Sequence, residues 1–109
     1  MPKENYSGKQ KIYFTKPRLD LISLMPINPK QKVLEIGMGG GDTLVEIKLK
    51  NLAGETVGID LMDLPDTNQQ NPLIDAVFFI DLDRDEINYP DNYFDVIIAG
   101  DVLEHLLDP

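Results

Sequence analysis

The sequence predicts an α/β fold built around a doubly wound parallel sheet, and three observations support this prediction. Several short runs of apolar and β-branched residues have the length and composition of buried strands; they span residues 32–36, 55–60, 74–80 and 94–99. A segment with apolar residues at helical spacing separates the first two runs. A glycine-rich turn joins the first run directly to that segment, as in the strand–helix units of parallel sheets.

The composition limits the possible functions. The chain has 109 residues, enough for one small domain, with 42% hydrophobic and 27% charged residues. It has no cysteine, so we predict neither a disulfide framework nor a thiolate metal site, and no metal at all. Nineteen acidic against ten basic residues give a net charge of −9, which disfavours nucleic acid as a partner.

No apolar run reaches the length of a transmembrane helix, so we expect no membrane partner. The first five residues lack the apolar centre of a signal peptide, and a cytoplasmic protein is the simplest expectation.

The N-terminal part divides into a polar segment and a short helix. Residues 1–13 are expected to be loosely packed, and residues 14–109 to form the folded domain. Thr15 can cap a helix, and Pro17 suits its first turn. Apolar residues then follow until Pro26 ends the helix.

The turn after the first strand is the strongest candidate for a binding site. Glu35 is the only acid in a strand predicted to be buried on both faces, where a charge is costly unless another group satisfies it. Gly37, Gly39 and Gly41 allow positive φ and let a ligand approach the main chain. We therefore favour a ligand with a hydrogen-bond donor over a turn that merely connects two elements.

Two other glycine-rich motifs fit this turn poorly. The dinucleotide fingerprint requires a small residue where this sequence has Asp42, and a phosphate loop requires a lysine before Thr43. Asp42 also places a negative charge where a phosphate would bind at a helix N-terminus. The expected ligand is neutral or positive near the turn. A nicotinamide-dependent oxidoreductase with a degenerate glycine loop remains an alternative.

The next helix is predicted over residues 43–53. Thr43 and Glu46 have the spacing of a capping box, and Gly54 is the expected helix stop. Residues 61–73 are rich in proline and polar residues and make a poor helix, although the fold requires a crossover there.

Acids stand at the ends of the second and third predicted strands. Asp60 stands about twenty residues after the glycine turn, where doubly wound folds place an acid that binds the ribose hydroxyls of an adenine nucleoside. The simpler alternative for Asp60 is a turn or helix-cap aspartate. Asp81 ends the third strand, and residues 89–93 form a turn before the fourth strand, expected to be buried.

These motifs together resemble one enzyme family. The pattern acid-x-Gly-x-Gly-x-Gly that starts at Glu35 resembles motif I of the class I S-adenosylmethionine-dependent methyltransferases. The block Phe-Asp-Val-Ile-Ile-x-x-Asp-Val-Leu-Glu-His-Leu-x-Asp-Pro, from Phe94 to Pro109, resembles the fourth-strand signature of one subgroup. That subgroup is associated with bacterial glycan biosynthesis, and the block is also similar to methyltransferases of quinone biosynthesis. The resemblance covers the chain from about Tyr13 onward.

The resemblance implies a Rossmann-like sheet with strand order 3-2-1-4, truncated after strand 4. It also implies S-adenosylmethionine as cofactor and a small-molecule or glycan methyl acceptor. Glu35 would face the methionine end of the cofactor, Asp60 the ribose and Asp81 the adenine. The expected cofactor-binding residues are Glu35, Gly37, Met38, Gly39, Gly41, Asp60, Leu61, Asp81, Leu82 and Asp101.

The catalytic residues are open at this level. Asp101 could face the cofactor or the acceptor, or cap a helix together with Glu104. His105 is the only histidine and could act as a general base, but helix packing is the favoured role.

The family fold has three strands beyond the fourth, so we expect this fragment alone to be inactive. The uncovered edge of strand 4 predicts a homodimer, through that edge or by exchange of elements. A cofactor-binding module without catalysis is the alternative function.

Overall fold

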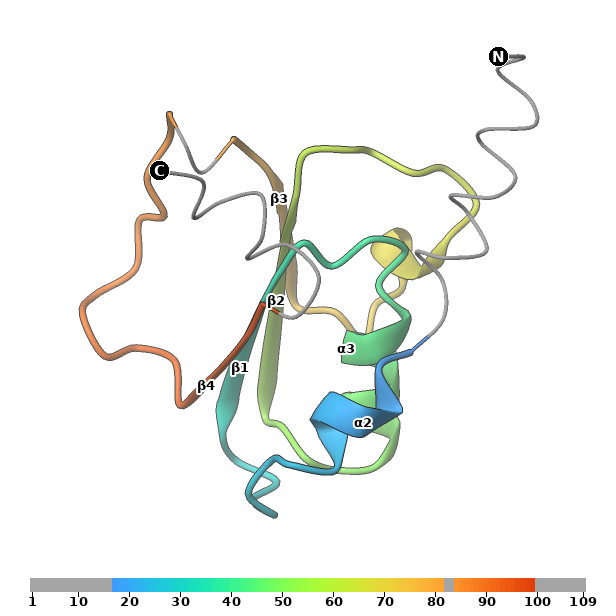
Figure 1. The fold of residues 1–109 in the computed structure, drawn as a ribbon, viewed down its shortest axis with the longest axis vertical. Coiled ribbons are helices and arrows are strands. Elements are labelled where there is room, and N and C mark those ends of the chain that lie inside the picture. Colours follow the sequence, from blue (N-terminus) through green and yellow to red (C-terminus); the bar gives the residue numbers. More distant parts are fainter. Residues whose placement is uncertain (1–16, 82–83, 100–109) are drawn as a thin grey trace.

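The computed structural model describes residues 17–81 and 84–99, which form one parallel sheet with helices (Figure 1). The strands are β1 (Lys32–Ile36), β2 (Glu55–Asp60), β3 (Ala76–Phe79) and β4 (Val96–Ile98). Their order in the sheet is β3-β2-β1-β4, which confirms the predicted Rossmann-like order. The helices are α2 (Leu19–Ile22), α3 (Asp42–Leu49) and a 3₁₀ turn, η1 (Asn68–Gln70).

The register aligns the ends of the central strands. β1 pairs with β2 from Lys32 opposite Glu55 to Ile36 opposite Ile59. The loops that follow β1 and β2 therefore leave the sheet at the same edge. We call this the carboxyl edge, and the opposite edge, where the strands begin, the amino edge.

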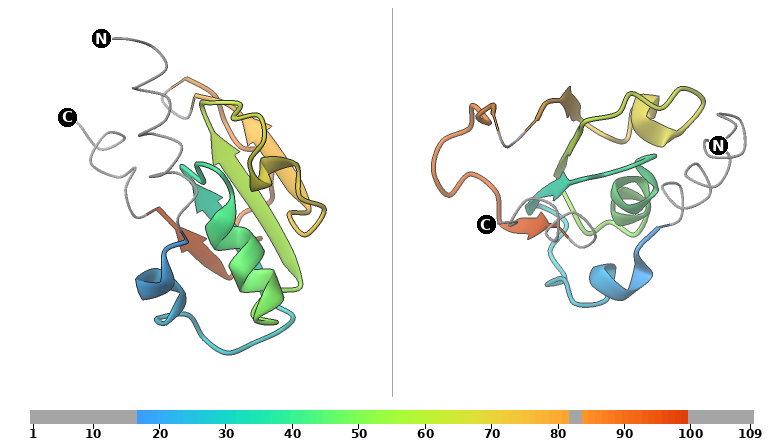
Figure 2. Two further views of the ribbon diagram at one scale, coloured as in Figure 1. Left: turned by 90° about the vertical axis from the view of Figure 1, so that its right-hand side faces the viewer. Right: turned by 45° about the horizontal axis from the view of Figure 1, so that its top comes forward.

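The two faces of the sheet are covered differently. Helices α2 and α3 lie over one face, and the segment 84–95 passes over the other (Figures 1 and 2). Adjacent residues of β1 point to opposite faces, so Val33 joins the helix-side core and Leu34 the other. The helix-side core comprises Ile22, Met25, Val33, Met38, Leu44, Val45, Ile47, Ala53, Ile74 and Ile98. On the opposite face Leu34, Val57 and Ile59 are buried against Tyr89 and Phe94, among others.

Helix α2 is a single turn that ends at Ile22, earlier than the predicted helix, which was expected to continue up to Pro26. The main-chain N–H groups of Leu24 and Met25 donate to Leu21 and Ile22, three residues back, so the chain tightens into a 3₁₀ turn. Pro26 follows directly, and a residue before proline is disfavoured in the α conformation.

The predicted capping box at the start of α3 is wrong. Gly41 occupies the N-cap position in a left-handed conformation, and no side chain caps this helix. The Thr43 hydroxyl instead accepts a hydrogen bond from the main-chain N–H of Arg18 at 2.9 Å, which ties α3 to the start of α2. Glu46 pairs with Lys50 one turn later, at 3.7 Å.

Helix α3 also ends earlier than predicted. Its last residue is Leu49, and Asn51 adopts the left-handed conformation, with φ of 57°, that was expected at Gly54. Asparagine is the residue that most often replaces glycine at this position. Among residues 17–81 and 84–99, no helix has the length and hydropathy that crossing a membrane would require.

Candidate functional site

The loop after β1 has the backbone that its glycines predict. Gly37, Gly39 and Gly41 have φ angles of 73°, 56° and 86°, in the left-handed region that residues with a Cβ rarely adopt. The main-chain N–H groups of Gly37 and Met38 both donate to the carbonyl of Ile59 in β2, at 2.8 and 3.0 Å. We call residues 37–41 the glycine loop; it rises from the carboxyl edge and leads into α3 (Figure 1).

Two glycines in or beside the glycine loop, Gly41 and Gly58, have close neighbours within the chain. A Cβ built on Gly41 would lie 2.8 Å from the Ile74 side chain and 3.1 Å from the carbonyl oxygen of Asn68. A Cβ on Gly58 of β2 would collide with the sulfur of Met38. Met38 is 3% exposed, so its side chain belongs to the core, and only its main chain could reach a ligand.

Asp60 connects the two loops at the carboxyl edge. Its Oδ2 accepts from the N–H of Gly39 at 2.7 Å, and its Oδ1 accepts from the N–H of Met62 at 3.0 Å. These contacts are those of a turn aspartate, the alternative role considered for it. An ionised carboxylate offers about four acceptor positions. Asp60 thus keeps capacity for further hydrogen bonds, and its ribose-binding role stays a prediction.

Glu35 is buried in β1, with 5% of its surface exposed, beside Gly58 of β2 and Ile98 of β4. The prediction of an acid inside the sheet is therefore confirmed. By strand alternation Glu35 shares the face of Val33, the one covered by α2 and α3.

Asp81 follows β3 in a tight turn. Its N–H donates to the carboxylate of Asp85 at 3.0 Å, and its carbonyl accepts from the N–H groups of Arg84 and Asp85. The register places Phe79 opposite Asp60, so Asp81 lies two residues beyond the level of Asp60 along the neighbouring strand. The structure thus brings Asp60 into contact with the glycine loop and sets Asp81 at the same edge.

The other predicted site residues divide into two groups. Leu61 is 68% exposed directly after Asp60, where its side chain is accessible to a ligand. Leu82, Asp101 and His105 lie outside the described residues, so their roles stay predictions. In the part of the chain that the structure describes, no three His, Cys, Asp or Glu side chains are grouped to hold a metal ion.

No pattern in the sequence indicates Gln69, which contacts both loops of the candidate site. This residue of η1 is 4% exposed, and its side-chain amide donates to the carbonyl oxygens of Gly39 and Met62. Its neighbour Asn68 donates to the Asp42 carboxylate at 2.6 Å. The polar run that made a poor helix is therefore folded against the glycine loop and the start of α3.

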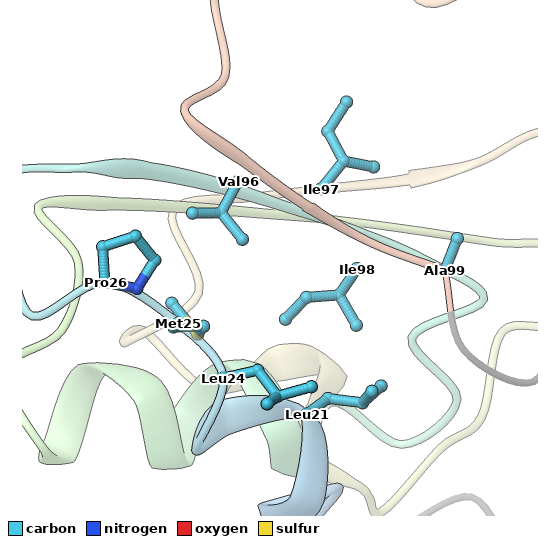
Figure 3. A pocket seen from close by; sticks show the side chains of 8 residues that line it. All are labelled: Leu21, Leu24, Met25, Pro26, Val96, Ile97, Ile98 and Ala99. Atoms are coloured by element: carbon cyan, nitrogen blue, oxygen red, sulfur yellow. The ribbon is translucent and has the colours of Figure 1, made fainter.

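An apolar cavity of about 340 Å³ lies away from this site, between α2 and β4 (Figure 3). Its lining residues are Leu21, Leu24, Met25, Pro26, Val96, Ile97, Ile98 and Ala99. Ile98 points toward the α2 side, whereas Ile97 points away and is 59% exposed (Figure 3). The prediction of a buried fourth strand is thus wrong at Ile97, because β4 is an edge strand and no described segment covers that side chain. With apolar side chains alone, the cavity is no candidate for polar cofactor recognition.

Comparison with known proteins yields one family. Residues 9–109 match the family described as a methyltransferase domain. The chain is 34% identical over 94 residues to phosphoethanolamine N-methyltransferase 3 of Arabidopsis thaliana, covering 82% of this chain and 19% of that protein. It is 28% identical over 88 residues to the ubiquinone/menaquinone biosynthesis C-methyltransferase UbiE of Vibrio campbellii, covering 73% of this chain and 33% of that protein.

The chain spans about a third of the length of the bacterial relative and about a fifth of the plant relative. No solved structure matches it.

Proposed function

Because the chain belongs to the methyltransferase domain family, we propose that its carboxyl edge binds S-adenosylmethionine for methyl transfer to a small-molecule or glycan acceptor. The glycine loop would lie along the cofactor, Glu35 would serve the methionine end, Asp60 the ribose and Asp81 the adenine. Leu61, Leu82 and Asp101 complete the proposed cofactor-binding set.

The observation that carries this proposal is the contact between Asp60 and the glycine loop. The Asp60 carboxylate lies 2.7 Å from the Gly39 nitrogen, so the acid after β2 is held against the loop after β1. In open α/β sheets, ligands bind outside the carboxyl ends of the strands. The acid after β2 and the glycine loop, the two features that the proposed nucleoside site requires, are therefore adjacent at the expected edge. Residues 38–41 of the loop are buried and Gly37 is partly exposed.

The charge at this edge favours a cationic cofactor over a phosphorylated one. Asp42 is the first residue of α3, where its carboxylate occupies the position that attracts phosphate at other helix N-termini. A pyrophosphate would meet this charge and that of Asp60. A sulfonium cofactor brings its own positive charge and leaving group, so the protein has mainly to bind and orient the reactants.

Isothermal titration of the chain with S-adenosylhomocysteine and with NAD tests the proposal. We expect S-adenosylhomocysteine to bind and NAD to bind much more weakly, because Asp42 is negatively charged and stands where the dinucleotide fingerprint requires a small residue. Asp60→Ala should weaken S-adenosylhomocysteine binding, whereas Asp63→Ala, an exposed acid in the same loop, should not. Tighter binding of NAD than of S-adenosylhomocysteine would contradict the proposal.

The proposed acceptor follows from the relatives and from the charge of the chain. The two relatives are named as a phosphoethanolamine N-methyltransferase and as a C-methyltransferase of ubiquinone/menaquinone biosynthesis, and none of these named compounds is a macromolecule. The net charge of −9 disfavours nucleic acid. The block from Phe94 resembles methyltransferases of glycan biosynthesis and also those of quinone biosynthesis. Transfer of a labelled methyl group by the full-length protein to sugars, quinone precursors and phosphoethanolamine would distinguish these acceptors.

We also retain the homodimer expected through the edge of β4. It is supported by the exposed Ile97 on an edge strand, since exposed apolar edges favour pairing with another strand. Sedimentation velocity on the wild-type chain and on Ile97→Lys tests it, and two monomeric species would contradict it.

A further inference from the structure

Two side chains, Asp60 and Gln69, bind the main chain of the same two residues. Asp60 accepts from the N–H groups of Gly39 and Met62, at 2.7 and 3.0 Å. Gln69 donates to the carbonyl oxygens of Gly39 and Met62, at 2.7 and 2.9 Å. Gly39 belongs to the glycine loop and Met62 to the loop after β2. Each loop therefore has two successive peptide planes held by this pair of side chains.

The chemistry of glutamine suits this position. Both carbonyl oxygens require a donor, and the two hydrogens of one amide nitrogen supply them. The Gln69 Oε1 accepts from the N–H of Leu64 at 2.7 Å, so the amide is satisfied on both sides although it is 4% exposed. An amide buried to this degree is costly unless its hydrogen bonds are made, so its orientation is well determined.

The position of Gln69 bears directly on the geometry of Asp60. The Gln69 side chain bonds to main-chain atoms of Gly39, Met62 and Leu64, so it acts on the site through the loops. The peptide planes that Gln69 holds at Gly39 and Met62 adjoin the N–H groups that orient the Asp60 carboxylate. A change in either plane would turn that carboxylate and shift its remaining acceptor positions.

We propose that Gln69 is a positioning residue of the cofactor site, which sets the separation of the two loops and the orientation of Asp60 between them. This inference rests on the proposed function, because the ligand that reports on it is the proposed cofactor.

The test compares substitutions at Gln69 with the same substitutions at Gln70, the exposed neighbour in η1. Gln69→Glu keeps the shape of the side chain and the acceptor for Leu64 but turns oxygen toward both carbonyls. Gln69→Ala removes all three hydrogen bonds. Isothermal titration with S-adenosylhomocysteine gives the affinities, and circular dichroism establishes that each variant is folded at the temperature of the titration.

We expect both Gln69 variants to lose roughly tenfold or more in affinity, because two or more hydrogen bonds of the site are lost. We expect Gln70→Glu and Gln70→Ala to change affinity by about twofold at most, as surface substitutions do. Should Gln69→Glu not fold, Gln69→Asn replaces it, since its shorter amide keeps the chemistry but cannot span both carbonyls.

A double-mutant cycle with Asp60→Asn separates positioning from general support of the fold. If Gln69 acts through Asp60, the affinity lost in the double variant is smaller than the sum of the two single losses. Additive losses would overturn the positioning role. Unchanged affinity in a folded Gln69 variant would overturn it as well, while leaving the proposed function intact. A wild-type chain that does not bind S-adenosylhomocysteine would overturn both.

Discussion

The polar side chains around Asp60, at the carboxyl edge, and those around Tyr93, at the amino edge, have different partners. At the carboxyl edge, Asp60 and Gln69 bind main-chain groups of loops, at distances from 2.7 to 3.0 Å. At the amino edge, the side chains around Tyr93 bind one another, whereas Gln31 binds the carbonyl oxygens of Pro26 and Leu52. The Tyr93 hydroxyl donates to Glu55 at 2.6 Å, and the Lys32 ammonium lies 4.3 Å from the centroid of the Tyr93 ring.

Aromatic rings extend the closed contacts of the amino edge. The ring centroids of Tyr89, Tyr93 and Phe94 lie 4.9 to 5.0 Å apart, in tilted or edge-on arrangements that aromatic pairs favour. At the start of β1, the main-chain N–H of Lys32 donates to the Asp95 carboxylate and the N–H of Asp95 donates to the carbonyl of Lys32, both at 2.8 Å. These groups satisfy each other, so this edge contributes to stability and presents little for a ligand.

The contrast indicates how one sheet can separate folding from recognition. Side chains that bind loop backbone leave carboxylate acceptors available and hold an otherwise soft glycine loop in one conformation. Side chains that bind one another, such as Tyr93 and Glu55, already have hydrogen-bond partners and therefore stabilise the fold. We therefore expect substitutions at the carboxyl edge to affect ligand affinity, and substitutions at the amino edge to affect stability alone.

The largest expected effect is that of Gly41→Ala at the carboxyl edge. The alanine would have to adopt a φ of 86°, and its Cβ would lie 2.8 Å from the Ile74 side chain and 3.1 Å from the Asn68 carbonyl oxygen. We expect the free energy of unfolding to fall by about 2 kcal/mol or more. S-adenosylhomocysteine affinity should fall with it, because the glycine loop is displaced. Urea denaturation and isothermal titration measure the two effects.

Gly54→Ala is the matched control at the amino edge. Its Cβ would lie 3.2 Å from the carbonyl oxygen of Lys30, a contact that a shift of a few tenths of an ångström relieves. We expect a cost below about 1 kcal/mol and unchanged affinity. Equal effects of the two substitutions would contradict the distinction between the edges.

How much of this the sequence predicts depends on what holds each segment. The bounds of β1 and β2 match their predictions. Central strands are buried and consist mainly of apolar residues, so the sequence pattern marks their ends. β3 and β4 are shorter than predicted, at Ala76–Phe79 and Val96–Ile98, since edge strands pair on one side only. The positive φ angles of the glycine loop were likewise predictable from residue type.

The polar segment from 61 to 73 could not be predicted in the same way. Gln69 reaches Gly39, thirty residues earlier in the chain. The next residue, Gln70, is also a glutamine but is exposed. Neither periodicity nor propensity distinguishes the two glutamines, because a tertiary hydrogen bond decides which is buried. The prediction of a capping box at α3 was wrong for a related reason. Thr43 has the capping-box spacing, but its hydroxyl accepts a hydrogen bond from the main-chain N–H of Arg18, in a distant segment.

A smaller effect, confined to the amino edge, is expected for the pair of Tyr93 and Glu55. The hydrogen bond to Glu55, with burial and the Glu55 charge adding to it, raises the pKa of Tyr93 to about 12. In the unfolded chain the phenol has a pKa of about 10. Since the folded value is higher, the contribution of Tyr93 to stability is complete below pH 10 and is lost as the pH rises from 10 to about 12.

Glu55→Gln should remove most of this shift. An ultraviolet titration of the folded chain would then show Tyr93 ionising closer to pH 10, with Tyr93→Phe identifying its signal. S-adenosylhomocysteine affinity at neutral pH should be unchanged in both variants. A loss of affinity would show that the amino edge also shapes the binding site.

The smallest effect is expected for Asp75, which precedes β3. Its Oδ2 accepts from Lys48 at 2.9 Å and from the N–H of Thr56 at 2.8 Å. Partial burial raises the pKa of Asp75, but the hydrogen bonds and charge of Lys48, with those from Thr56, outweigh it, so the pKa is lowered from its usual value. The Asp75 side chain is 41% exposed, so we expect Asp75→Asn to cost only about 0.5 kcal/mol at neutral pH, after screening by solvent.

The pH dependence gives this prediction its sign. Because the folded pKa is below the unfolded one, the stabilisation is present above a pH of about 4 and is lost as the pH falls through the lowered value. Urea denaturation of wild type and Asp75→Asn from pH 7 downward should therefore show a difference that shrinks in acid. Asp91→Asn, in an exposed turn, controls for the loss of one surface charge. A difference that widens toward low pH would show that Asp75 is destabilised by burial, and that its pairing with Lys48 does not compensate.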